Sequence, residues 1–170
     1  MSRSLSEHFT ARRVGALAFS AGATVLTSLV LSAGSVAAER GPSATGSGHF
    51  NSFGRLRTFA FSAITHQDGS VTGQAQLGNR GDNTTEHLSI NCLEVMGNIA
   101  YISGFVLDSS NPDLVGGTGV FSVQDNGEGA KSPRDQMSIV TNSAGTAPMV
   151  CQSEHPAPDN QIDGGNIQIH

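Results

Sequence analysis

Four hard oxygen donors gather in one short stretch of the chain, "FSVQDNGEGAKSPRDQMSIV" (121–140), and they could bind a metal. They are Asp125, Asn126, Glu128 and Asp135. Carboxylate and amide oxygens are the ligands that Ca²⁺ prefers. An EF-hand loop needs glycine at its sixth position, where this chain has Ala130. The favoured interpretation is therefore a glycine-rich loop between two strands, with Asp and Asn bonding their own backbone.

A second group of polar side chains lies on two segments expected to pair, and it is a candidate ligand site. Its members are Gln74, Gln76, His87 and Asn91. Inside a barrel these side chains would line a polar pocket. The alternative is that they form the wet outer face of half-buried strands. That alternative is favoured, because simple alternation along a strand already gives it.

Other site chemistry is missing from the sequence. The histidines do not form H-x-x-x-H or H-E-x-x-H spacing, which zinc sites on a helix use. There is no G-x-S-x-G or S-x-x-K motif for a nucleophilic serine. The glycine-rich stretches at 116–119 and 163–166 lack the helix start that would cradle a phosphate. The sequence predicts no cofactor and no catalytic residue.

Two cysteines, Cys92 and Cys151, make up the whole cysteine content. An even count in an exported protein predicts a disulfide. Its loop of about 60 residues would contribute about 4 kcal/mol in the chain-entropy model. The alternative is a reactive thiol, which is disfavoured because neither cysteine has a nearby basic residue to lower its pKa.

The first 38 residues have the pattern of a secretory signal peptide. Three arginines and one glutamate come first, the run 14–38 carries no charged residue, and "SVAA" precedes Glu39. Cleavage is predicted after Ala38, with Ala37 as second choice. An uncleaved membrane anchor is the alternative, since 25 uncharged residues can span a bilayer. Many of them are Ala, Gly, Ser and Thr, which favours a cleaved signal, a secreted protein and no stable membrane span.

The remaining 132 residues are acidic, with six basic against thirteen acidic residues and a formal charge of −7. Binding to phosphate backbones depends on clustered Lys and Arg. Only Arg55 and Arg57 lie close together. This composition therefore argues against a nucleic-acid partner.

After the signal, apolar residues recur at every second position and not every 3.6 residues. Phe59, Phe61 and Ala63 alternate with polar or small residues, and "SVTGQAQL" (70–77) alternates in the same way. Asp68-Gly69 between these runs predicts a hairpin turn. Gly97-Asn98 predicts a second two-residue turn. These patterns are typical of antiparallel strands.

The run 87–95 changes phase: Leu88, Ile90 and Cys92 share one parity, whereas Leu93 and Val95 share the other. A one-residue slip of this kind predicts a β-bulge. In the following run 99–107 the odd-numbered residues, including Tyr101, Phe105 and Leu107, are expected to face the core.

These observations predict an all-β protein, a single antiparallel β-barrel of about seven or eight strands over residues 49–170, with a β-sandwich as the alternative. An up-and-down meander is favoured. The segment 39–48, "ERGPSATGSG", is rich in small and polar residues and is expected to be a flexible leader.

The pieces "DGSVTGQAQLGNR", "INCLEVMGNIAYISG", "FSVQDNGEG" and "GGNIQIH" resemble a group of small exported bacterial proteins, many of them actinobacterial. The resemblance covers about residues 46–170. It implies export, a single all-β domain and a bacterial source. It implies no activity and no site residues.

The leading functional hypothesis is a binding or structural extracellular protein, with a small ligand or another macromolecule as partner. One alternative is a small β-barrel enzyme of the cyclase or isomerase kind, with scattered polar site residues. Another is a surface module stabilised by Ca²⁺. A cavity of about 300 Å³ or more with converging polar groups would favour ligand binding or catalysis, and a filled interior would favour a structural role.

Overall fold

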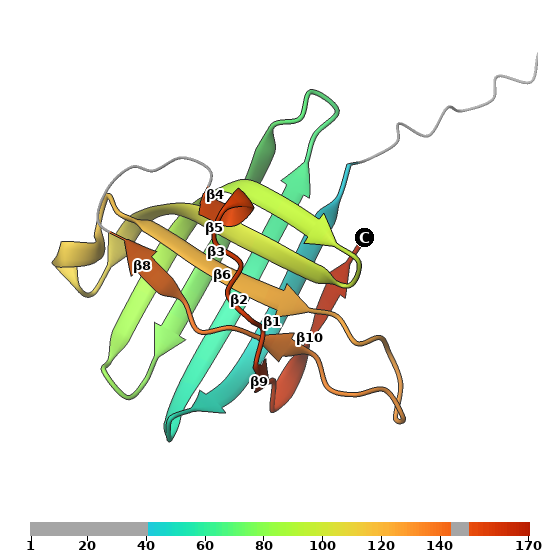
Figure 1. Cartoon of the computed structure of the whole chain (residues 1–170). Coiled ribbons are helices and arrows are strands. Elements are labelled where there is room, and N and C mark those ends of the chain that lie inside the picture. The colour runs from blue at the N-terminus through green and yellow to red at the C-terminus, as the bar shows by residue number, and fades with distance from the viewer. Residues whose placement is uncertain (1–40, 144–149) are drawn as a thin grey trace, which may run out of the picture. The chain divides into compact units, whose positions relative to one another are not determined.

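The computed structural model describes residues 41–143 and 150–170, and within them the regular structure is almost entirely β (Figure 1). The expected signal peptide lies outside the described residues. The elements are β1 (Ser43–Ser52), β2 (Arg55–Thr65), β3 (Val71–Asn79), β4 (Thr84–Met96), β5 (Ile99–Ser109), η1 (Pro112–Leu114), β6 (Thr118–Gln124), β7 (Gln136–Met137), β8 (Thr141–Ser143), η2 (Val150–Gln152), β9 (Asn160–Gln161) and β10 (Gly164–Ile169). No helix in this part of the chain has the length and apolar character needed to cross a bilayer.

The strands form one antiparallel, barrel-like sheet in the order β10-β1-β2-β3-β4-β5-β6-β7-β9, with β8 also paired to β6. Strands β1 to β6 follow one another as a meander, and β10 lies beside β1 (Figure 1). The prediction of an antiparallel all-β fold is confirmed. The described residues contain ten strands instead of seven or eight, because β7, β8 and β9 have only two or three residues each. Such short strands leave no alternation to read.

Both predicted turns are present. The β2–β3 turn contains Gly69 with φ 80°, and the β4–β5 turn contains Gly97 with φ 63°. These are left-handed conformations that favour glycine. In the first turn Asp68 Oδ1 also accepts a hydrogen bond of 2.9 Å from the Ser70 N–H. A hydrogen bond from the Ser70 hydroxyl, together with this backbone bond, lowers the pKa of Asp68.

The segment 43–48 is a strand and not part of a flexible leader, so that expectation is wrong. Its small residues serve close packing. A Cβ added at Gly46 would lie 2.7 Å from Cε1 of Phe61, closer than side chains tolerate. Glycine in a strand often marks such a close approach. Composition alone cannot separate a glycine that makes room for an aromatic ring from a glycine in a linker.

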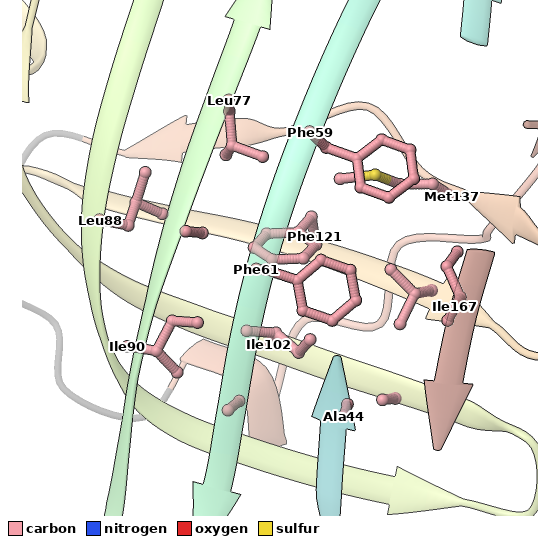
Figure 2. Packing of buried hydrophobic residues seen from close by; sticks show 14 of the residues in the cluster. Ala44, Phe59, Phe61, Leu77, Leu88, Ile90, Ile102, Phe121, Met137 and Ile167 are labelled. Carbon is pink, nitrogen blue, oxygen red and sulfur yellow. The ribbon is translucent and has the colours of Figure 1, made fainter. Parts of the chain in front are cut away.

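The core lies on the inner face of the sheet, where the side chains of Phe59, Phe61 and Phe121 project between the strands (Figure 2). The rings of Phe61 and Phe121 meet edge to face, with centroids 5.6 Å apart. Burying a side chain of this size contributes about 1.5–3 kcal/mol. Smaller apolar residues complete the layer: Ala44, Ala63, Ala75, Leu77, Leu88, Ile90, Ala100, Ile102, Val106, Val123, Met137 and Ile167. The middle of the barrel is therefore filled.

The β4–β5 pair contains the predicted bulge: the register shifts between Ile90 and Cys92, and a second shift lies between His87 and Leu88. The expected inward face of β5 is wrong. Its even-numbered residues Ala100, Ile102 and Val106 are buried in the core, while Leu107 is 62% exposed. Tyr101 lies on the outer face, where its ring centroid is 4.2 Å from that of His155.

A segment after residue 150 covers the outer face of β4, β5 and β6, which explains why β5 has apolar residues on both parities. Cys92 and Cys151 lie at disulfide-bonding distance with Cα atoms 6.0 Å apart. The Ser122 hydroxyl donates to the Pro156 carbonyl at 2.5 Å. His155 Nε2 lies 3.0 Å from Glu94 Oε2. The predicted cysteine pair thus fastens this cover to the sheet.

Candidate functional site

A cavity of about 260 Å³ opens at one end of the barrel, and we call it the mouth pocket. The bases of the β1–β2 and β3–β4 hairpins, the η1 loop and the β7–β8 segment contribute its walls. Its apolar lining is Phe50, Phe59, Leu77, Leu114, Met137 and Val140. Among its polar lining residues are three that we call the polar trio: Arg57, Glu86 and Asn142.

Strand alternation places Arg57 and Glu86 in the mouth pocket. Arg57 has the same parity as the inward-facing Phe59 on β2, and Glu86 has the same parity as the inward-facing Leu88 on β4. Glu86 is opposite Leu77 on the intervening strand β3. Both charged residues therefore continue the inner face of the sheet to its end, where the packed apolar layer stops.

Asn142 reaches the pocket from β8, where it is opposite Gly119 of β6. A Cβ at Gly119 would lie 3.1 Å from Asn142 Oδ1 and 2.7 Å from Leu88 Cδ2. Glycine at this position thus leaves the space that the asparagine amide occupies. Asn142 Nδ2 donates a 3.2 Å hydrogen bond to Glu86 Oε1. This bond joins two members of the polar trio across 56 residues of sequence.

One polar atom on each member of the trio is buried and has no hydrogen-bond partner among the described residues. These atoms are Arg57 Nε, Glu86 Oε2 and Asn142 Oδ1. An unpaired buried donor or acceptor costs about 1–3 kcal/mol. Native proteins contain few such groups, and all three of these belong to residues that line one cavity, which points to a missing binding partner.

The electrostatics of the pocket centre on Glu86. Burial raises the pKa of this carboxyl, and the Asn142 hydrogen bond and the charge of Arg57 only partly oppose that effect. Loss of hydration disfavours the charged form of a buried acid. At the rim, Arg55 forms an ion pair with Asp82, and Asn79 Nδ2 donates to Asp82 Oδ2 at 2.7 Å. The rim is thus polar and internally paired.

The polar group proposed from the sequence as a ligand site lies elsewhere. Gln74, Gln76, His87 and Asn91 are all exposed on the outer face of β3 and β4. Gln76 and His87 are opposite each other in register, and Asn91 sits in the bulge. They do not line the mouth pocket, because their neighbours Ala75 and Leu77 occupy the inward positions. The wet outer face, the alternative interpretation, describes their position.

The four oxygen donors of the 121–140 stretch do not come together as a metal centre. Within the described parts of the chain, no group of three or more His, Cys, Asp or Glu is placed to hold an ion. Their oxygens accept hydrogen bonds from N–H groups instead. Asp135 Oδ1 accepts from the Asn126 N–H at 2.9 Å, and Glu128 Oε1 accepts from Asn166 Nδ2 at 2.8 Å. The stretch is a loop, as the favoured interpretation has it.

Two of these acids, Asp125 and Asp135, have a structural task at the free edge of β10, and we call them the Asp clasp. Just after β10 the N–H of His170 bonds the Ser43 carbonyl of β1, and along a strand adjacent N–H groups point to opposite edges while those two residues apart point to the same edge. The N–H groups of Ile167 and Ile169 therefore point away from β1. Asp135 Oδ2 accepts the first at 2.9 Å, and Asp125 Oδ2 accepts the second at 3.1 Å.

Sequence reasoning missed the polar trio, although a signal for two of its members was present. Arg57 and Glu86 fall at core-facing positions of two strands whose alternation was recognised. Charged residues at such positions are rarely buried without a partner or a function. Asn142 left no signal, since it lies on a three-residue strand.

Comparisons with protein-family models, with curated proteins and with solved structures find no match to this chain. Its mouth pocket therefore has to be interpreted from its own residues.

Proposed function

We propose that this domain binds a small organic molecule in the mouth pocket, with the polar trio holding its polar group. The observation that carries the proposal is that three buried, unpartnered polar atoms belong to residues lining one cavity, which also has apolar residues in its walls. Ligand sites commonly combine apolar walls with a few placed polar groups that fix orientation.

The size of the cavity limits the ligand. Sites for drug-sized molecules have volumes of about 300–1,000 Å³, whereas the mouth pocket has about 260 Å³. The filled middle of the barrel, with Phe59 and Phe61 below the pocket, blocks deeper entry. The bound molecule is therefore small, or it is the end group of a larger one that extends past the rim.

We place this binding outside the cell, in an exported bacterial protein. The N-terminal pattern of a secretory signal supports this, as does the Cys92–Cys151 pair at disulfide-bonding distance, which is compatible with an oxidising environment. N-terminal sequencing of protein from culture medium tests the export proposal. A mature chain that still begins at Met1 would contradict it.

Ligand-observed NMR with a library of small neutral molecules tests the binding proposal. We expect signals from bound compounds with the wild-type protein, and loss of these signals in Arg57→Met, which keeps the aliphatic stem and removes the guanidinium. Arg134→Met is the matched control, since that arginine is exposed and does not line the pocket. Compounds that bind the wild type and Arg57→Met equally would refute the pocket as the site.

Proton-transfer catalysis in the same pocket is a second candidate, favoured by one observation. Burial raises the pKa of Glu86, which brings a carboxyl closer to the pH at which it can act as a general acid or base. Glu86→Gln separates the two proposals. Binding without catalysis predicts that any compound bound by wild type stays chemically unchanged in long incubations. Conversion of that compound by wild type, but not by Glu86→Gln, would establish the enzyme.

A further inference from the structure

We propose that the ligand is a neutral, polyhydroxylated ring, a monosaccharide unit that presents two adjacent hydroxyl groups to Arg57, Glu86 and Asn142. This inference rests on the proposed binding function of the mouth pocket. It comes from the hydrogen-bonding types of the three unpartnered atoms, from the charge balance of the pocket and from the distribution of apolar and polar lining.

The three atoms define what a ligand must offer. Arg57 Nε is a donor, whereas an ionised Glu86 Oε2 and Asn142 Oδ1 are acceptors. A hydroxyl group donates and accepts through one oxygen. One ligand hydroxyl can accept from Arg57 and donate to Glu86, and its neighbour can donate to Asn142. Two adjacent hydroxyls therefore satisfy all three atoms.

The charges in the pocket favour a neutral ligand. Arg57 and Glu86 carry opposite charges, and the charge of Arg57 acts on the Glu86 carboxyl. A carboxylate or phosphate on the ligand would be drawn to Arg57 but would meet the carboxylate of Glu86. An ammonium group on the ligand would be drawn to Glu86 but would be repelled by Arg57. Placing a second charge of either sign in this partly desolvated site is costly.

The lining favours a ring with polar groups around its circumference. The inner wall is apolar, with Phe50, Phe59 and Met137, and suits the C–H face of a pyranose. The lining is also polar in part, with Asn79, Thr84 and Asn111 among its residues. A primary amide with an apolar remainder also offers donors and an acceptor, but it would place apolar groups against this polar part of the lining. A monosaccharide has hydroxyls for both the trio and the rim.

Saturation-transfer NMR with defined probes tests the inference. The neutral probes are glucose, galactose, mannose, xylose, N-acetylglucosamine and myo-inositol. The charged probes are glucuronate and glucosamine, and nicotinamide is the primary amide without hydroxyls. We expect at least one neutral probe to bind, and both charged probes to bind about tenfold more weakly or not at all, a factor that corresponds to one unfavourable polar contact.

Variants link the binding to the polar trio. Glu86→Gln is nearly isosteric, and Arg57→Met and Asn142→Leu remove one polar group each. Each is expected to weaken the sugar by about tenfold or more, the effect of one lost buried hydrogen bond. Gln76→Met on the exposed outer face is the control, with unchanged affinity expected. Far-UV circular dichroism identifies any variant that fails to fold, and Glu86→Gln then decides.

The outcomes separate the two proposals. Binding of nicotinamide or of a charged probe at the trio, with no sugar bound, would overturn the hydroxylated-ring inference and leave the pocket function standing. Sugar binding that the trio variants do not weaken would overturn both, because the site would then lie elsewhere. Failure of every probe and of the neutral library would also overturn both.

Discussion

Asp135 is the residue on which the closure of the barrel should depend most. It is buried and accepts two backbone hydrogen bonds, from the N–H groups of Asn126 and Ile167. A hydrogen bond to a charged group contributes about 1.5–3 kcal/mol, so Asp135→Ala should lower the free energy of unfolding by about 3–6 kcal/mol. The whole stability of a domain is only about 5–15 kcal/mol. The change should therefore be visible without ligand and without any functional assay.

Urea unfolding followed by circular dichroism measures this effect, and Asp135→Asn refines it. The asparagine keeps one acceptor oxygen but turns an amide nitrogen towards an N–H, so it should recover less than half of the loss. Asp108→Ala is the control, since that aspartate is exposed on β5. A loss below about 1 kcal/mol for Asp135→Ala, similar to what surface substitutions cause, would refute the role of the Asp clasp.

Three further outcomes follow from other features. Burial raises the pKa of Glu86 above 4.5, so the folded protein binds this proton more tightly than the unfolded chain does. The free energy of unfolding should therefore fall as pH rises from 4.5 through the raised pKa. Urea titrations at several pH values measure this slope, and Glu86→Gln should flatten it. Replacing Cys92 and Cys151 by alanine should cost up to about 4 kcal/mol in the same assay, and reducing agent should then have no additional effect; equal stability of the two proteins would count against the bond. Phe53 is 88% exposed and has φ 52° in the β1–β2 turn, a conformation that asparagine adopts more readily than phenylalanine. Phe53→Asn is therefore expected to raise the melting temperature through about 1 kcal/mol of relieved strain. A lower melting temperature would contradict this.

Much of the sheet could be predicted from the sequence, because its long strands alternate over many residues. Phe59 and Phe61 on β2, and Ala75 and Leu77 on β3, have the burial that their alternation predicted. The turns and the bulge near Asn91 also carried local signals, in glycine and in a change of phase. These features depend on neighbours in sequence, so one chain is enough to reveal them.

The features that could not be predicted depend on distant residues. The phase predicted for β5 was wrong because Tyr101 packs against a covering segment that is anchored at Cys151. No local sequence pattern indicates that segment. The acids of the 121–140 stretch have the composition of a cation site. Their real partners are the N–H groups of β10, 32 and 44 residues further on. The polar trio similarly combines Arg57, Glu86 and Asn142 from three strands.

The position of β10 beside β1 has a consequence for synthesis. These two strands pair in register from Ala44 with Ile169 to His49 with Gly164. The outer edge of β1 is therefore covered only after β10 has been synthesised. Contacts of such long sequence separation form late and slowly. A nascent chain emerging from the ribosome would remain open, with β1 exposed on one side, until more than a hundred further residues had followed. For the export proposed above, such a delay would leave time for a translocation channel to thread the polypeptide before it folds.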